Sequence, residues 1–144
     1  MVDLKYAIVC VDDDPSILQV LGFQLHKYID GNCVFMEFFS DPLEAYENIG
    51  ELLNNQIDII FILVDYQMPG LNGADLIRKI KALNPGLKCI MLSGQANAIK
   101  VDELVSDNLL EAFISKPWEE SELLSAIKPL VEEKNIGLKL RIKG

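Results

Sequence analysis

The stretch FILVDYQMPG, residues 61–70, largely decides how this sequence folds. Four apolar residues lead directly into Asp65, and a proline and a glycine follow it within five positions. A continuous apolar run is typical of a strand that is covered on both faces. A carboxylate at the end of such a strand loses hydration, and this loss is costly unless another group compensates for the charge. The stretch therefore predicts a buried strand that delivers an aspartate with a specific chemical role.

Similar apolar runs occur on both sides of this strand in the sequence, and helical patterns separate them. The expected strands are YAIVCV (6–11), CVFMEFF (33–39), IDIIFILV (57–64), KCIML (88–92) and AFI (112–114). Between them, apolar residues recur with the helical period, which indicates helices with one buried face. A strand and a helix repeated five times predict an α/β fold, (βα)5, with a doubly wound five-stranded parallel sheet and right-handed crossovers.

Local signals mark where the helices begin and end. Asp14-Pro15 and Asp41-Pro42 each offer an N-cap side chain and a proline for the first turn. Pro129 falls inside the pattern of the last helix, so we expect that helix to kink or restart near Lys128. We expect residues 1–130 to form one domain, and residues 131–144 to be a helical extension or a linker toward an output domain.

Length and charge limit the classes of function. The chain has 144 residues, half of them apolar, which predicts one compact domain. Its net charge of −9 disfavours direct binding to nucleic acid or to an anionic membrane. Cys10, Cys33 and Cys89 lie in apolar runs, so we expect reduced packing residues and a cytoplasmic location. The first residues do not resemble a signal peptide, and no apolar run approaches the ~20 residues of a membrane span.

Polar residues follow four of the five expected strands, at the edge of a parallel sheet where ligands bind. They are Asp12, Asp13 and Asp14 after the first strand, Asp65 after the third, Ser93 and Gly94 after the fourth, and Ser115, Lys116 and Pro117 after the fifth. Converging carboxylates repel one another unless a cation joins them, and oxygen ligands of this kind suit Mg²⁺. An ionised Asp65 could then attack phosphorus as a nucleophile, while Lys116 and the Ser93 hydroxyl neutralise the transferring phosphoryl group.

Four motifs at these strand ends resemble the receiver domain of two-component response regulators. They are VDDDP (11–15), VDYQMPGLNG (64–73), LSG (92–94) and FISKPW (113–118), and the resemblance extends over about residues 5–130. Four motifs in the right order, each at an expected strand end, are far more specific than any one of them. The resemblance implies a flavodoxin-like sheet with the strand order 2-1-3-4-5, similar to that of chemotaxis regulators. It also implies a phosphoprotein of two-component phosphorelay signal transduction.

This resemblance assigns the acceptor and the metal ligands. Asp65 would be the phosphoacceptor, and a phosphohistidine on a sensor histidine kinase or a phosphotransfer protein would be the donor. Asp13 and Asp65 would bind Mg²⁺ directly, and Asp12 would bind it largely through water. The backbone carbonyl of Gln67 would complete the protein ligands.

The resemblance also implies a conformational switch. Ser93 would move toward the phosphoryl group, Lys116 would pair with one of its oxygens, and Phe113 would turn inward into the vacated space. Pro117 would follow a cis peptide bond. The face that changes would consist of the fourth expected helix (about 96–106), the fifth strand and the fifth helix. It would contact an output domain or effector, or a second copy in a homodimer.

The resemblance places two glutamines beside the path that a hydrolytic water would take. Gln67 and Gln95 lie two positions after Asp65 and Ser93 respectively. Their amides provide no base to activate water, which predicts moderate to slow self-dephosphorylation, whereas Gly94 leaves the approach open. The expected chemistry is self-catalysed phosphorylation and dephosphorylation, without turnover of a small substrate.

Two other interpretations use part of the same residue set. A haloacid-dehalogenase-like Mg²⁺-dependent phosphatase would use Asp12 as its nucleophile, since Asp12 and Asp14 have the D-x-D spacing, with Ser93 and Lys116 in later roles. That class would leave Asp65 without a function. It also has a pair of acidic metal ligands late in the sequence, and no such pair follows Lys116 here. A degenerate receiver would bind partners without binding Mg²⁺.

Overall fold

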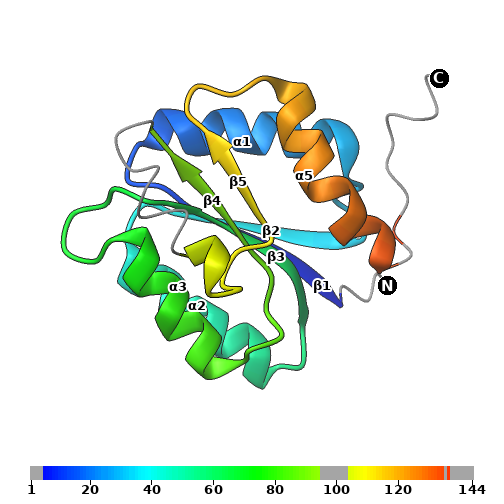
Figure 1. The fold of residues 1–144 in the computed structure, drawn as a ribbon. Coiled ribbons are helices and arrows are strands. Elements are labelled where there is room, and N and C mark those ends of the chain that lie inside the picture. The colour runs from blue at the N-terminus through cyan, green and yellow to red at the C-terminus, as the bar shows by residue number, and fades with distance from the viewer. Residues whose placement is uncertain (1–4, 95–103, 135, 137–144) are drawn as a thin grey trace.

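Five parallel strands form one sheet in the order β2-β1-β3-β4-β5 (Figure 1). The computed structural model describes residues 5–94, 104–134 and 136. Its strands are β1 (Tyr6–Val11), β2 (Val34–Phe39), β3 (Asp58–Asp65), β4 (Cys89–Ser93) and β5 (Ala112–Ser115). Each pair of neighbours is parallel. The doubly wound, flavodoxin-like fold expected from the sequence is confirmed, strand order included.

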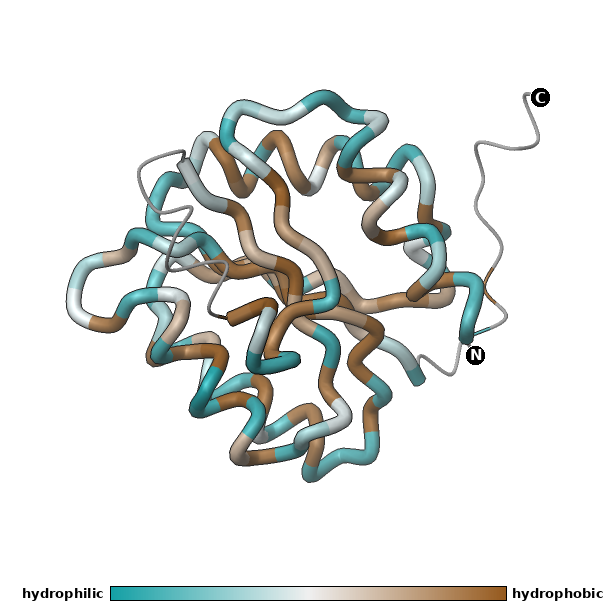
Figure 2. Tube along the Cα trace, viewed as in Figure 1, coloured by the Kyte–Doolittle hydropathy of each residue, from teal (hydrophilic) through white to brown (hydrophobic). Residues whose placement is uncertain are grey.

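Helices cover both faces of this sheet (Figure 1). The helices α1 (Pro15–Tyr28) and α5 (Glu120–Glu133) lie on one face, and α2 (Pro42–Asn54) and α3 (Gly73–Leu83) lie on the other. The strands β1, β3 and β4 lie between the two layers, so nearly all of their residues are buried. Figure 2 shows the result as a hydrophobic centre with hydrophilic helix surfaces and turns. Burial on both faces explains why the middle of each of these strands is continuously apolar.

The expected helix starts occur where the capping residues lie. Asp14 accepts a hydrogen bond from the Ser16 backbone N–H at 2.9 Å and caps α1. Asp41 accepts one from the Leu43 N–H at 3.0 Å and caps α2. Each cap satisfies an N–H group that has no partner within its helix. Asp14 therefore has a structural role that separates it from the two aspartates before it.

Of the two outcomes expected at Pro129, a kink or a restart, the restart does not occur in α5. The helix runs continuously from Glu120 to Glu133 with Pro129 inside it. Pro129 lies on the exposed side of α5. The carbonyl that loses its helical hydrogen bond on that side can bind water instead, which lowers the cost of the proline.

Cys33 also departs from the expectation. It is exposed in the turn that precedes β2, which begins one residue later than expected, at Val34. Cys10 and Cys89 are fully buried packing residues, and burial raises the pKa of both thiols, to about 12 for Cys89. Across the part of the chain described, no helix has the length and apolar character needed to cross a bilayer.

Some expectations concern residues outside the described ranges. Most of the expected fourth helix and Gln95 fall within residues 95–103, and the alternating tail falls within residues 137–144. Leu104–Ser106, at the end of the expected helix, are helical. The helix α5 extends past the expected domain boundary at residue 130, and Ile136 packs against the core between the sheet and the α1 and α5 layer.

Candidate functional site

The carboxyl ends of β1, β3, β4 and β5 meet at one edge of the sheet. Asp65 is the last residue of β3 and pairs with Leu92, and Ser93 at the end of β4 pairs with Ser115. Asp12 follows β1 directly, and its backbone N–H donates to the Phe39 carbonyl at 3.1 Å. Because the strands are parallel and in register, residues far apart in the sequence become neighbours at this edge.

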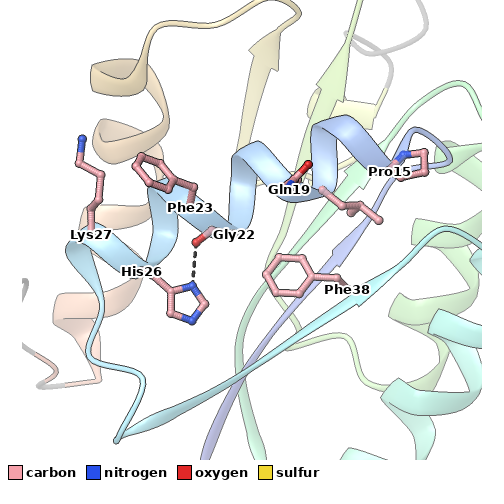
Figure 3. Close-up of a pocket in the computed structure, with 8 residues that line it drawn as sticks. Pro15, Gln19, Gly22, Phe23, His26, Lys27 and Phe38 are labelled. Carbon is pink, nitrogen blue, oxygen red and sulfur yellow. Dashed lines mark hydrogen bonds between the residues drawn. The ribbon is translucent and has the colours of Figure 1, made fainter.

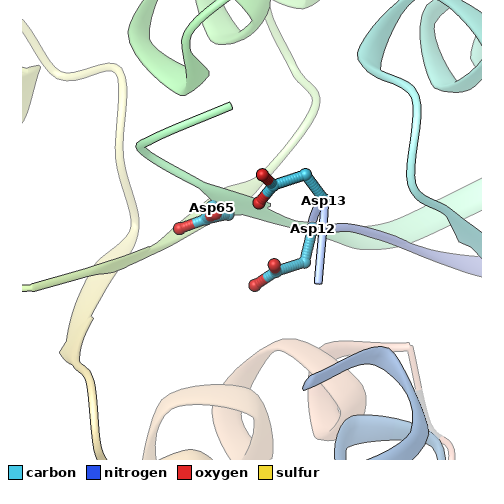
Figure 4. Close-up of side chains that lie close together, drawn as sticks. All are labelled: Asp12, Asp13 and Asp65. Atoms are coloured by element: carbon cyan, nitrogen blue, oxygen red, sulfur yellow. The ribbon is translucent and has the colours of Figure 1, made fainter. Parts of the chain in front are cut away.

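Three carboxylates converge there (Figure 4). Asp12, Asp13 and Asp65 each offer an oxygen, and these oxygens all lie within 4.8 Å of one another. Asp12 and Asp65 are buried, with 0% and 4% of their surface exposed, whereas Asp13 is open to solvent. Asp14, one residue further, is not part of this group because its carboxylate caps α1.

Lys116 connects two of these carboxylates. Its Nζ lies 2.8 Å from Asp12 Oδ2 and 2.9 Å from Asp65 Oδ1. The other oxygen of Asp12, Oδ1, accepts from the Asp14 backbone N–H at 2.9 Å. Both oxygens of the fully buried Asp12 therefore have a donor. The expectation that the acid cluster needs a cation is met in part by the protein's own ammonium group.

Burial and the neighbouring carboxylates destabilise the ionised form of Asp65. Burial raises the pKa of Asp65 to about 6; the Lys116 hydrogen bond opposes the rise, and the neighbouring charges of Asp12 and Asp13 add to it. For Lys116, burial lowers the pKa, but hydrogen bonds to Asp12 and Asp65 outweigh burial and raise it overall. An additional cation beside Asp65 would therefore stabilise its ionised form.

The donor set fits Mg²⁺. Three carboxylate oxygens within reach of one small ion, one of them on an exposed side chain, match the way Mg²⁺ binds through a few carboxylates while it keeps several waters. The cluster contains no thiolate or imidazole, the ligands that favour softer metals.

The structure also describes other residues that the sequence assigned to the site. Ser93 is buried, and its hydroxyl donates to the Gly94 carbonyl at 3.1 Å. The peptide bond between Lys116 and Pro117 is cis. Gln67 lies exposed in the turn after Asp65, and Phe113 on β5 is half-buried against the core that α2 and α3 cover.

Sequence analysis missed the role of Gly73, the first residue of α3. Its N–H donates to the Tyr66 carbonyl at 2.8 Å, and a side chain there would collide with the backbone of Asp65. The glycine that follows a capping asparagine in LNG was the available signal, since Asn72 accepts from the Asp75 N–H at 2.8 Å. A glycine at the start of a helix indicates a close approach of another backbone.

Sequence analysis also missed the links between α1 and the turn after β5. The indole Nε1 of Trp118 donates to Gln24 Oε1 at 2.9 Å. Glu120 accepts from Lys27 Nζ at 2.9 Å and from the hydroxyl of Tyr28. These contacts attach the segment that follows Lys116, up to the first residue of α5, to the helix α1.

An apolar groove lies away from the acid cluster, between α1 and β2 (Figure 3). Gly22, Phe23 and Phe38 form part of its wall, and His26 Nδ1 lies 2.7 Å from the Gly22 carbonyl oxygen. A second apolar hollow, lined by Ile17, Val20 and Trp118 among others, adjoins Lys116. The acid cluster, and not these grooves, carries the chemistry predicted from the sequence.

A doubly wound parallel sheet with an aspartate cluster, a lysine and a hydroxyl at its carboxyl edge defines a class of signalling receiver domains. Residues 8–128 match the family described as the response regulator receiver domain. The chain belongs to this family, as its four motifs implied.

Relatives and solved structures agree with this assignment. The chain is 30% identical over 128 residues to the transcriptional regulatory protein YesN of Bacillus subtilis, and the aligned region covers 89% of this chain and 33% of YesN. It is 26% identical over 125 residues to the DNA-binding response regulator MtrA of Mycolicibacterium smegmatis, covering 87% of this chain and 50% of MtrA. A crystal structure of a response regulator receiver domain protein from Clostridium thermocellum superposes with a TM-score of 0.76 at 28% identity, covering 90% of this chain and 97% of that one. The chain thus spans half or less of the length of these two regulators.

Proposed function

We propose that Asp65 of this receiver domain accepts a phosphoryl group from a phosphohistidine of a partner protein. The observation that carries the proposal is the placement of the buried Asp65 within 4.8 Å of two further carboxylates and 2.9 Å from Lys116. A carboxylate oxygen of Asp65 forms the new bond to phosphorus while the phosphorus–nitrogen bond of the donor histidine breaks, and the electron pair returns to the imidazole. The donor belongs to a sensor histidine kinase or a phosphotransfer protein.

The proposal assigns a task to each neighbour of Asp65. Asp13, Asp65 and the Gln67 carbonyl would hold Mg²⁺ directly and Asp12 largely through water, and the ion would supply positive charge for the oxygens of the phosphoryl group. Lys116 exchanges its contact with Asp65 for one with a phosphoryl oxygen, since the new acyl phosphate carries the charge outward. With such a cation bound, Asp65, whose pKa burial raises, would remain ionised at neutral pH.

Signal output follows from the same site. Ser93 and Phe113 form the proposed switch, and they act on the face made by the segment between β4 and β5, the strand β5 and the helix α5. This face would contact an output domain, an effector or a second copy of the chain. The positions of both side chains, buried for Ser93 and half-buried for Phe113, support a population shift between two packings. Loss of the phosphoryl group is self-catalysed, and Gln67 and Gln95 keep it moderate to slow.

Three further assignments belong to this proposal. Residues 1–130 form the receiver domain, and residues 131–144 extend the last helix or lead toward an output domain. The protein acts in the cytoplasm. The negative net charge of the chain supports a signalling role without direct contact to nucleic acid or membrane.

Intact-mass spectrometry tests the proposal directly. The protein is treated with acetyl phosphate and Mg²⁺, and wild type is compared with Asp65→Asn and with Asp58→Asn. Asp58 lies at the opposite end of the same strand, so its variant removes an equal charge far from the acid cluster. Wild type and Asp58→Asn should gain the mass of one phosphoryl group, and Asp65→Asn should gain none. An equal gain in all three would remove Asp65 from its role, and repeated hydrolysis of the donor through Asp12 would favour the phosphatase alternative.

A further inference from the structure

Gly73, the first residue of α3, packs directly against the peptide unit that joins Asp65 to Tyr66. A Cβ atom at Gly73 would lie 2.4 Å from the Asp65 carbonyl oxygen and 2.9 Å from the Tyr66 Cα. Both neighbours are backbone atoms at the end of a buried strand, so they cannot move aside as a flexible side chain can. Glycine therefore fits between α3 and β3 where any larger residue would displace one of them.

Hydrogen bonds hold this peptide unit and the next one. The Tyr66 N–H, which belongs to the Asp65–Tyr66 peptide, donates to the Leu92 carbonyl on β4 at 2.9 Å, and the Tyr66 carbonyl, which belongs to the following peptide, accepts from the Gly73 N–H at 2.8 Å. The hydrogen bond between Tyr66 and Gly73 therefore closes the turn that contains Gln67. Its geometry depends on how closely α3 approaches Asp65.

We propose that Gly73 is a positioning residue for the metal and phosphoryl chemistry of Asp65. By allowing α3 to contact the Asp65–Tyr66 peptide, it sets the direction of the Asp65 carboxylate and the place of the Gln67 carbonyl. An alanine would have to push the Asp65 oxygen away by about 1 Å to reach the ordinary contact distance of 3.4 Å. Metal–ligand distances in well-formed sites lie within about 0.2 Å of their usual values, so a backbone shift of this size would disturb the carboxylate that the same residue carries. This inference rests on the proposed function, because it assumes that Asp65 is a Mg²⁺ ligand.

The test is the Mg²⁺ dissociation constant of the full chain, measured by isothermal titration calorimetry. Gly73→Ala is compared with Gly50→Ala, the same chemical change in α2 at a position with nothing within 4 Å of the added atom. Ile77→Val serves as the control for stability, since Ile77 is fully buried in α3. Gly73→Ala should bind Mg²⁺ about tenfold more weakly or worse, as variants that disturb the support of metal ligands do. Both controls should bind within about twofold of wild type, because neither adds an atom against the Asp65 peptide.

The outcomes separate the inference from the function on which it rests. Gly73→Ala with the affinity of wild type would overturn the inference and leave the proposed function intact. A wild type that does not bind Mg²⁺ would instead contradict the proposed function. If Gly73→Ala does not fold, a Mg²⁺ titration of the wild-type protein followed by nitrogen-15 NMR tests the inference instead. The Gly73 amide signal should then shift during the Mg²⁺ titration with the same dissociation constant as that of Tyr66, and an unmoved Gly73 signal would overturn the inference.

Discussion

Lys116 Nζ lies 2.9 Å from Asp65 Oδ1, and the two residues come from strand ends that are separated by β4 in the sheet. In the proposed function this ammonium group would supply positive charge beside the phosphoacceptor. Lys116 also lies 2.8 Å from Asp12, so it partly neutralises two buried carboxylates in the metal-free protein. This arrangement compensates for part of the charge repulsion within the acid cluster.

Removal of this ammonium should destabilise the metal-free protein. Lys116→Met leaves Asp12 and Asp65 buried without their cation, and breaking a buried ion pair costs about 3 kcal/mol. The free energy of unfolding, measured by urea titration in EDTA, should fall by about that amount. Saturating Mg²⁺ should restore part of the loss because the ion replaces the missing charge. Lys88→Met, which breaks the half-exposed pair of Lys88 with Glu111, should cost less than about 1 kcal/mol.

The stability of the metal-free protein should depend on the charge of Asp65 in a defined pH range. The pKa of this carboxyl is about 6 in the folded protein, against an ordinary value of 3.8. Below pH 3.8 the Asp65 carboxyl is protonated in both the folded and the unfolded protein, so it adds no pH dependence to the free energy of unfolding. As pH rises toward the higher value, the unfolded chain releases its proton more readily, which favours unfolding, and above the higher value the cost is constant.

Asp65→Asn tests this dependence. It should raise the free energy of unfolding by about 2 kcal/mol at pH 8 in EDTA, and the gain should shrink toward zero near pH 4. Urea titrations of both proteins across that range measure the difference. A gain that stays constant with pH would indicate that ionisation of Asp65 is not its cause.

Mg²⁺ should stabilise the protein through Asp13. A ligand present at about one hundred times its dissociation constant raises the free energy of unfolding by about 2.7 kcal/mol. Asp13→Asn should abolish this gain with little effect on the metal-free protein, since Asp13 is exposed. Asp14→Asn is the matched control, because it removes an adjacent charge while asparagine still caps α1. Thermal unfolding with Mg²⁺ and with EDTA measures both effects, and equal losses in the two variants would argue against a specific Asp13 contact.

The Trp118 indole should report on the contact between α1 and the turn after β5. Trp118 is the one tryptophan of the sequence, and it donates to Gln24 at 2.9 Å. Gln24→Leu removes the acceptor at nearly constant volume, so the free energy of unfolding should fall by about 1 kcal/mol and the indole emission should shift. Gln24→Glu keeps an acceptor and should leave the emission close to that of wild type. Similar spectra for all three proteins would show that the hydrogen bond does not form in solution.

Much of the site could be predicted because each of its chemical groups directly follows an apolar strand. Asp12, Asp65 and Lys116 were found in this way, and the parallel order of strands then required them to lie at one edge. The mutual distances could not be predicted, since they depend on the register of strands that are distant in the sequence. The Gln24–Trp118 contact was missed because its partners are distant in the sequence, and Gly73 was missed because only the packing of α3 against β3 shows how closely it approaches Asp65.

Cys33 departs from the expectation for a local reason. It adjoins an apolar run and was assigned to its strand, but the turn before β2 includes it. At Pro129 the helix was expected to kink or restart, and it does not restart, because Pro129 lies on the exposed side of α5, where water can take the place of the lost hydrogen bond. A sequence pattern describes which elements form more reliably than it describes their ends.

The amino-acid sequence by itself determined the βα alternation, the capped helix starts and the chemical groups at the strand ends, because burial, capping and strand periodicity act over a few neighbouring residues. Only the tertiary structure decided that Lys116 joins Asp12 to Asp65 and that Gly73 contacts the Asp65 backbone. These contacts depend on how the helices and strands pack against one another, and such packing is a property of the whole fold.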